Sequence, residues 1–298
     1  MPVLRASNRK LHLSNVSEDW SRDFSFIQAA DCQLGMEWSC SGTGGYGQNK
    51  GYEPHYDDCT WHHEMRWCMS FVDMVNGMQP QPKFVVICGD ILDAWPQKWP
   101  AVRDKQYNDF QKIFSNLKVP LVCVCGNHDV GNSPTPQSVA KYRSDFGDDW
   151  FTFVCDGMLC IVLNSQYYED FQYVPDIAAE QEKWLDKQLA AASQYQHTVV
   201  FQHIPWFLDT PNEPKLYYNF PQPLRERMLR KFADAGVAKI FCGHYHRNGG
   251  GWYNASMEVV VTSALGLQQG TDRNGFREVN VSRSGITHRY INISSIDP

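Results

Sequence analysis

The sequence lacks the features of a membrane protein or a nucleic-acid-binding protein. No apolar run approaches the length of a membrane span, and Met1 to Trp20 contains no apolar block of signal-peptide length. Lysine and arginine form no run, and the net charge is -6. These absences argue against a nucleic acid or an anionic membrane surface as the main partner, and they favour a cytoplasmic protein.

Cysteine is not scarce, but its placement does not indicate a disulfide framework. Several of the 10 cysteines lie inside apolar runs of strand character, which favours buried free thiols. Cys123 and Cys125 are spaced to share one face of a strand, and no second pair stands at zinc-site spacing. A zinc–thiolate cluster is therefore not expected.

Strand and helix patterns alternate along most of the chain. The apolar content of 43% over 298 residues can build one sizeable core, and no repeat or linker divides it. We predict a polar, loose amino-terminal arm over residues 1–23 and one α/β domain over residues 24–293. The predicted strands are 24–30, 83–88, 121–125, 151–155, 159–163, 198–201 and 238–242, with more strands in 257–293. Helical patterns begin near 61, 107, 135, 184 and 224.

One long segment has no periodicity. Leu34 to Cys59 is rich in glycine, tyrosine and asparagine and follows the end of the first predicted strand. Loops of this length either serve function or are solvated insertions, and both readings stay open here. The aromatic segments Tyr46 to Tyr56 and Trp206 to Phe220 are candidates for shaping a cleft or for contacting a partner.

Polar side chains follow the predicted strands at the point where each strand ends. The carboxyl ends of parallel strands meet at one edge of a sheet, so these side chains should converge in one cleft. A single histidine such as His203, taken alone, is better explained as a satisfied core residue. Polar groups at every strand end, however, would be costly without a shared partner. These residues are Asp31, Gln33, Asp90, Asn127, His128, His203, His244 and His246.

The mixture of carboxylate, amide and imidazole donors suits first-row divalent ions. Manganese, iron and zinc all fit such a set, whereas softer ions prefer thiolates. Two histidines two residues apart, as in His244 and His246, can each reach one of two neighbouring ions. A carboxylate that bridges such a pair, about 3.5–4 Å apart, helps to lower the pKa of a bound water to roughly 7. The sequence therefore predicts a cofactor of two divalent metal ions.

The ordered motifs resemble the calcineurin-like metallophosphoesterase superfamily from Phe24 to about Ile293. Its pattern runs Asp-x-His, Gly-Asp, Gly-Asn-His-Asp/Glu, His and Gly-His-x-His, and within it Gly-Asn-His-Asp-Val-Gly-Asn is similar to a group of cytoplasmic serine/threonine phosphatases. The resemblance implies a four-layer α/β/β/α sandwich whose second sheet is formed largely by carboxyl-terminal strands. It also implies hydrolysis of a phosphomonoester, phosphoserine or phosphothreonine in a phosphoprotein substrate, by a metal-bound hydroxide.

The resemblance also assigns roles to single residues. His128 would protonate the leaving alkoxide or steady the phosphoryl group, and Asp93 would orient His128. A helix cap is the alternative for Asp93, and Asp129 is taken as structural. Asp90 would bridge the two ions. One ion would be held by Asp31, Gln33, Asp90 and His246, and the other by Asp90, Asn127, His203 and His244.

The chain departs from the family pattern in places that leave alternatives open. Gln33 replaces a histidine ligand, so one ion is expected to bind loosely. Ala94 and Trp95 stand where calcineurin itself has an arginine that grips phosphate, which makes Arg247 a candidate for that role. The same ligands would serve a cyclic-nucleotide phosphodiesterase or a nucleotide hydrolase. A catalytically weak metal-binding scaffold is the alternative from another class, and Gln33 is its only support.

Overall fold

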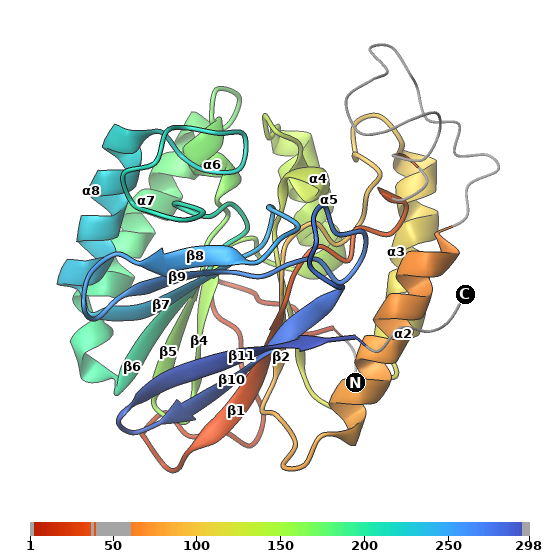
Figure 1. The fold of residues 1–298 in the computed structure, drawn as a ribbon. Helices are drawn as coiled ribbons and strands as arrows, with labels where there is room; N and C mark the ends of the chain where they lie inside the picture. The colour runs from red at the N-terminus through yellow and green to blue at the C-terminus, as the bar shows by residue number, and fades with distance from the viewer. Residues whose placement is uncertain (1–2, 37–38, 40–60, 294–298) are drawn as a thin grey trace.

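The computed structural model describes residues 3–36, 39 and 61–293 and consists of two sheets between layers of helices (Figure 1). The first sheet has five strands in the order β11-β10-β1-β2-β3, and the second has six in the order β4-β5-β6-β7-β9-β8. The first comprises β1 (Phe24–Ala29), β2 (Val85–Cys88), β3 (Leu121–Val124), β10 (Gly275–Ser282) and β11 (Gly285–Asn292). The second comprises β4 (Phe151–Cys155), β5 (Met158–Val162), β6 (His197–Phe201), β7 (Val237–Cys242), β8 (Gly249–Trp252) and β9 (Glu258–Val261).

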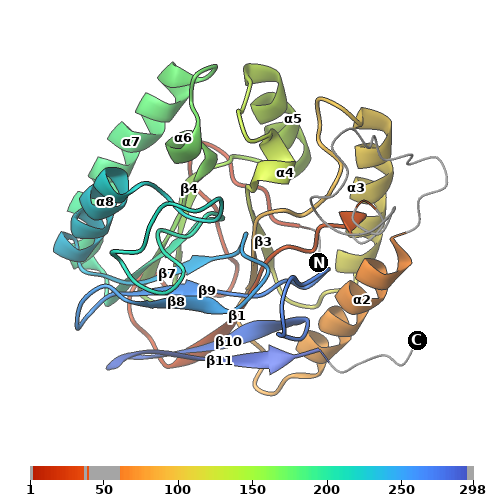
Figure 2. The same ribbon diagram turned by 45° about the horizontal axis from the view of Figure 1, so that its top comes forward.

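Helices cover the outer face of each sheet. Figure 2 shows α7 and α8 on one side of the molecule and α2 and α3 on the other, with the sheets between them. The helices are α2 (His62–Gly77), α3 (Pro100–Phe114), α4 (Asn127–Val130), α5 (Pro136–Phe146), α6 (Gln166–Glu169), α7 (Pro175–Ala190) and α8 (Gln222–Asp234). The predicted helices near 61, 135 and 224 are confirmed, whereas α3 and α7 begin several residues earlier than their apolar spacing indicated.

Alternation along the strands divides the apolar core into three interfaces. In β1, Phe26 packs between the two sheets, while its neighbour Ile27 belongs to the cluster beneath α2 and α3. In β6, Phe201 packs between the sheets and Val200 belongs to the cluster beneath α7 and α8. Helix, sheet, sheet and helix therefore follow one another, and the predicted four-layer fold is confirmed.

The carboxyl-terminal strands are shared between the two sheets, which corrects one expectation. β8 and β9 extend the second sheet, but β10 pairs antiparallel with β1, from Phe24 opposite Val281 to Gln28 opposite Arg277, and β11 follows β10. Without β10, β1 would present an unpaired edge to solvent. The last two strands therefore complete the first sheet and not the second.

The amino-terminal residues are not loose, which corrects a second expectation. Val3 bridges Leu121 of β3, and Lys10 bridges Thr152 of β4. Leu11 is buried, and its N–H donates to the carbonyl of Thr152 (2.9 Å). β3 and β4 are edge strands of the two sheets, so the arm supplies backbone partners to both edges. A domain boundary at residue 24 stays a prediction.

Thr135 caps α5, as its sequence pattern predicted. Its hydroxyl accepts a hydrogen bond from the N–H of Ser138 (3.2 Å), and Pro136 occupies the first helical position. We expect Thr135→Ala to lower the free energy of unfolding by about 1 kcal/mol, because one N–H of the first turn loses its acceptor. Urea denaturation measures this difference, and equal midpoints for the two proteins would contradict it.

Other sequence expectations have mixed outcomes. The cysteines within the described ranges are buried and free. Among these residues, no helix combines the length and apolar character needed to cross a bilayer. Most of the Leu34 to Cys59 segment, including Tyr46 to Tyr56, lies outside the described residues.

Candidate metal centre

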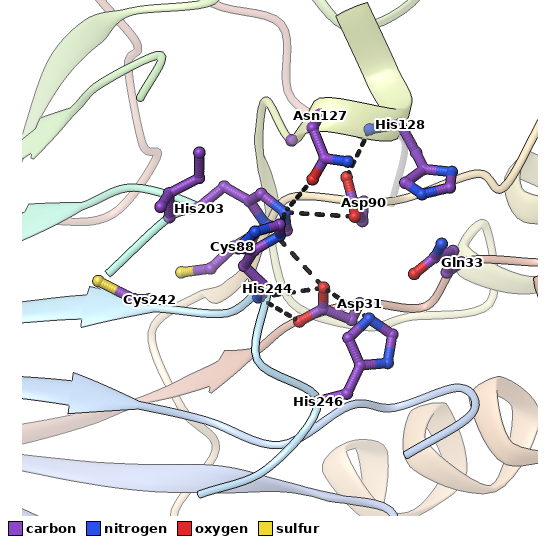
Figure 3. Close-up of polar contacts among 12 residues, drawn as sticks. Asp31, Gln33, Cys88, Asp90, Asn127, His128, His203, Cys242, His244 and His246 are labelled. Atoms are coloured by element: carbon purple, nitrogen blue, oxygen red, sulfur yellow. Dashed lines mark hydrogen bonds and ion pairs between the residues drawn. The ribbon is translucent and has the colours of Figure 1, made fainter. Parts of the chain in front are cut away.

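The predicted site residues follow strands of both sheets and meet where the carboxyl ends of these strands come together (Figure 3). Asp31 and Gln33 follow β1, Asp90 follows β2, and Asn127 and His128 begin α4 after β3. His203 follows β6 in the second sheet, and His244 and His246 follow β7. The sequence predicted convergence on the edge of one sheet, whereas the structure builds the site from two.

A direct contact joins the two sheets at this point. The main-chain N–H of His244 donates to the carboxylate of Asp31, at 3.0 and 3.2 Å from its two oxygens. Asp31 comes from the first sheet and His244 from the second, and both are buried. This hydrogen bond fixes the two groups of candidate ligands relative to each other.

The backbone at these strand ends is held in an unusual conformation. The φ angles of Asp31, Gln33, Asp90, His244 and His246 are 54°, 36°, 48°, 70° and 54°. Each lies in the left-handed region, which costs a residue other than glycine of order 1–3 kcal/mol. Such strain clusters at functional sites, where the surrounding structure over-determines the backbone.

Two glycines make room for the side chains. Gly89 has a φ of +85°, and a Cβ there would lie 2.4 Å from Nδ1 of His203. A Cβ on Gly126 would lie 2.3 Å from Oδ1 of Asp90. The glycines of the Gly-Asp and Gly-Asn-His-Asp motifs therefore let Asp90 and His203 approach the backbone closely.

One group of candidate ligands surrounds Nε2 of His203. Nδ1 of this ring lies 2.8 Å from the carbonyl oxygen of Cys88 and so acts as the donor, which leaves Nε2 as the nitrogen that can bind a proton or a metal ion. Nε2 faces Oδ2 of Asp90 at 3.2 Å and Oδ1 of Asn127 at 3.0 Å. It also lies 3.1 Å from Nδ1 of His244. Electron-pair donors converge here, which is the environment that a cation requires.

The pKa values of this group follow from the same crowding. Burial alone would raise the pKa of Asp90, but the charges of His203 and His128 lower it. Burial opposes a charge on His203, yet Asp90 raises the pKa of that imidazole to about 9. The pKa of His244 falls well below its usual value because of burial and the nearby His203. Asp90 therefore stays ionised and attracts positive charge.

The second group of candidate ligands surrounds Asp31. Nδ1 of His246 lies 2.5 Å from the carbonyl oxygen of Leu267, so Nε2 keeps its lone pair and faces Oδ1 of Asp31 at 3.3 Å. Asp31, Asp90 and His246 each offer one ligand atom, and these atoms lie within 4.8 Å of one another. The ligand atoms of Asp90, His203 and His244 likewise lie within 4.8 Å of one another. Asp90 belongs to both groups, as a bridging carboxylate would.

Gln33 presents an unused oxygen to this second group. Its Nε2 donates to Oδ1 of Asp93 (3.1 Å), whereas its buried Oε1 has no hydrogen-bond partner among the described residues. A buried acceptor left without a donor costs about 1–3 kcal/mol. The carboxylate of Asp93 therefore turns the amide so that its oxygen is available to a cation.

His128 lies beside the two groups and belongs to neither. Its Nδ1 is 2.7 Å from the main-chain oxygen of Asp93 and 3.5 Å from the carboxylate of the same residue. The main-chain N–H of His128 donates to Oδ1 of Asp90 (2.8 Å). The ring of Trp95 packs edge-on against the His128 imidazole. Nδ1 is thus engaged by the main chain, which leaves Nε2 for a substrate. The predicted role of the Asp93 carboxylate in orienting His128 stays a prediction.

Asp129 and Arg103 support the loops that carry these residues. Asp129 accepts hydrogen bonds from the N–H groups of Gly126 (2.9 Å) and Ile91 (3.3 Å), and it lies 3.6 Å from Arg103. Arg103 donates to the carbonyls of Ala94 (3.1 Å) and His128 (3.2 Å). Arg103 was not among the predicted site residues, although its position seven residues before Phe110 places it on the same, buried face of α3.

A small pocket opens above the candidate ligands. Asp90, Asn127, His128, His244 and His246 line it together with Gln33, while Asp31 and His203 lie deeper and are fully buried. The rings of Tyr217 and Tyr218, from the aromatic segment Trp206 to Phe220, lie 5.2 and 5.6 Å from His244 at its rim. Arg247, the candidate for binding phosphate, packs on Tyr245 instead and does not contribute to the lining of this pocket.

Asp93 offers a test of the Gln33 geometry. We expect Asp93→Ala to weaken the binding of one divalent ion about 10–100-fold, because the Gln33 amide loses the group that orients it. The main-chain contact of His128 remains in this variant. Calorimetric titration of the metal-free protein with manganese measures the affinities, and unchanged values at both sites would contradict the expectation.

Comparisons with known proteins agree with this geometry. Residues 58–248 match the family model described as calcineurin-like phosphoesterase. The chain is 41% identical to a serine/threonine-protein phosphatase CPPED1 from Bos taurus, over 98% of this chain and 91% of that protein. It is 38% identical to the protein of the same name from Danio rerio, over 98% of this chain and 93% of the relative.

Solved structures share the fold at much lower identity. A dimetal phosphatase from Danio rerio superimposes with a TM-score of 0.60 at 14% identity, covering 90% of this chain and 99% of the other. GAP50 of Plasmodium superimposes with a TM-score of 0.62 at 14% identity, covering 93% of this chain and 87% of GAP50. The family match spans more than half of the sequence, and the curated relatives align over nearly all of it. The chain belongs to the calcineurin-like phosphoesterase family.

Proposed function

We propose that this phosphoesterase removes phosphate from phosphoserine and phosphothreonine in proteins, with two divalent metal ions as cofactor. The observation that carries the proposal is the sharing of Asp90 by two groups of ligand atoms, each within 4.8 Å, beneath a pocket that displays His128. The curated relatives named serine/threonine-protein phosphatase support the choice of substrate.

The residues present fit two ions. Oε1 of Gln33 has no hydrogen-bond partner in the described part of the chain, and donor atoms crowd Nε2 of His203, so both positions suit a cation. Manganese, iron or zinc suits this set of oxygen and nitrogen donors. When bound, such a pair supplies positive charge for the phosphoryl oxygens and a water whose pKa is lowered to roughly 7. One ion would be held by Asp31, Gln33, Asp90 and His246, and the other by Asp90, Asn127, His203 and His244.

His128 would handle the proton of the leaving group. The contact of its Nδ1 with the main chain at Asp93 orients the ring and places the exchangeable proton on Nε2. From there the proton passes to the seryl or threonyl oxygen as the bond to phosphorus breaks. The contact with Trp95 restrains the ring and covers part of it from water.

The alternatives differ in the bond that is hydrolysed. A cyclic-nucleotide phosphodiesterase or a nucleotide hydrolase would use the same ligands, and a scaffold would bind metal without turnover. The presence of His128 in the pocket argues against the scaffold, because this imidazole lies outside both groups of ligand atoms and metal binding alone would not require it.

Hydrolysis of a panel of substrates tests the proposal. Phosphoserine and phosphothreonine peptides, a phosphotyrosine peptide and a cyclic nucleotide are each incubated with metal-stripped protein to which manganese, iron or zinc is returned. We expect metal-dependent release of phosphate from the first two peptides at the highest kcat/KM. Cleavage of the cyclic nucleotide alone would replace the proposal with the phosphodiesterase, and tight metal binding without turnover of any substrate would replace it with the scaffold.

The cytoplasmic location expected from the sequence belongs to the same proposal. The cysteines within the described ranges are buried thiols, which suits a reducing compartment.

A further inference from the structure

A second cavity of about 250 Å³ adjoins the metal pocket. The two share Asn127, Tyr217 and His244, and the other walls come from α6 and from the segment that follows α4. Figure 1 shows α4 and α6 on the same side of the molecule, beyond the ends of the strands. A group in this cavity would therefore sit next to a phosphoryl group held above the candidate ligands.

We propose that this cavity binds a lysine or arginine side chain that neighbours the phosphorylated residue of the protein substrate. The inference rests on the proposed function, because it places a phosphopeptide across the metal pocket. It adds a specificity subsite to that function.

Gln166 provides the first observation. This residue of α6 lines the cavity, is 1% exposed, and its Oε1 has no hydrogen-bond partner within the described ranges. Its main-chain N–H is held by Oδ1 of Asn164 (3.1 Å), which fixes the start of the helix. A buried amide oxygen without a donor is costly, so a ligand that brings N–H groups would satisfy it.

The charges of the lining provide the second observation. Glu169 and Asp170 both contribute to the cavity wall, whereas no lysine or arginine lies among the described lining residues. Lys215, which is not part of the lining, forms an ion pair with Glu169 (2.8 Å). Burial would raise the pKa of Asp170, but hydrogen bonds, first that from Ser133, lower it, so this carboxyl stays ionised. Two carboxylates against one ammonium leave the cavity negative, which favours a cationic occupant and opposes a second phosphate.

Tyr217 provides an apolar wall between the two pockets. Its ring lies 5.2 Å from His244 and is 55% exposed at the rim. Lysine and arginine carry an apolar stem below a charged head, and such a stem packs well against an aromatic face. The lining therefore matches both parts of a basic side chain. Tyr217 would contact the apolar stem, and Gln166 and the two carboxylates would bind the charged head.

Matched phosphopeptides test the inference on the metal-loaded full chain. The peptides share one sequence around a phosphoserine and carry arginine, its neutral isostere citrulline, or glutamate at successive positions on either side. We expect arginine to raise kcat/KM about tenfold over citrulline at one of these positions, as suits a charged hydrogen bond. Glutamate there should give the lowest value.

Variants then assign the preference to the cavity. Gln166→Leu and Glu169→Gln should each bring the ratio of kcat/KM for the arginine and citrulline peptides close to one. Glu226→Gln is the matched control, because this carboxylate lies on the exposed side of α8, where it pairs with Arg230, and does not line the cavity. The control should keep the ratio of the unchanged protein.

Equal kcat/KM values for the arginine and citrulline peptides at every position would overturn the inference. So would a loss of nucleotide hydrolysis in Gln166→Leu without any change in peptide selectivity, since the cavity would then hold a base. If no phosphopeptide is hydrolysed at all, the proposed function fails, and the dissociation constants of the same peptides then test the cavity separately. Equal affinities for the arginine and citrulline peptides would overturn the inference that the cavity binds a basic side chain. Tighter binding of the arginine peptide would support it.

Discussion

Replacing Asp90 with asparagine should lower kcat about a thousandfold and reduce bound metal from two ions to at most one. Within the described part of the chain, Asp90 alone is common to both groups of ligand atoms, and its Oδ2 lies 3.2 Å from Nε2 of His203. Asparagine keeps the volume, and its remaining oxygen can still accept the N–H of His128. The substitution therefore removes the charge between the two ions and leaves the loop geometry nearly intact.

Metal analysis and steady-state kinetics on the same samples measure this effect. Asp73→Asn is the control, because Asp73 is an exposed carboxylate of α2 that belongs to neither group of ligand atoms, and it should keep both metal content and kcat. An Asp90→Asn protein that retains two ions and turns over within a factor of ten of the unchanged protein would show that Asp90 does not bridge them.

His128→Ala should lower kcat by about 10²–10⁴ while the metal content stays at two ions. His128 lines the pocket but lies outside both groups of ligand atoms, so its loss removes the proton donor and not a ligand. The loss should be larger for a phosphoserine peptide than for an aryl phosphate, because a phenolate departs more readily without a proton.

The leaving-group comparison separates catalysis from structure. Equal losses on the two substrates would indicate that His128 steadies the phosphoryl group and does not deliver a proton, and an unchanged kcat would remove it from the chemistry. A parallel fall in metal content would identify it as a ligand. His12→Ala is the control, since His12 is an exposed residue of the amino-terminal arm.

The sequence was most informative where the pattern is local. A strand of Leu121–Val124 followed by Gly-Asn-His-Asp can be recognised without knowing its neighbours, because apolar strand residues and the polar turn are contiguous. The rule that strand ends hold ligands then placed Asp31, Asp90 and Asn127 together. The same reasoning brought in His203, His244 and His246 but assigned all of them to one sheet.

The sequence was least informative where the outcome depends on which edges the assembled sheets leave open. Neither the pairing of β10 with β1 nor the bridges of Val3 and Lys10 to edge strands follows from a local pattern. Both satisfy backbone groups that exist only after the sheets have formed. Pairing partners of this kind require the whole fold.

The direction in which a side chain points could not be predicted from the motifs either. The sequence indicates only that Gln33 replaces a histidine, whereas the structure adds that Asp93 turns its amide, so that the oxygen has no hydrogen-bond partner among the described residues. The backbone at Gln33 is also left-handed, and such a φ cannot be anticipated for a glutamine. Arg103 was missed for a related reason: its partner carbonyls, those of Ala94 and His128, lie on either side of α3 in sequence, and only the fold brings them to one side chain.

The most direct test of the account is a titration of metal-stripped protein with manganese, in which bound ions and phosphate release from a phosphoserine peptide are followed together. We expect no release without metal and the full rate only as the second ion binds, since Asp90 joins both groups of ligands. Full release by the stripped protein, or two bound ions with no hydrolysis of any phosphomonoester, would contradict it.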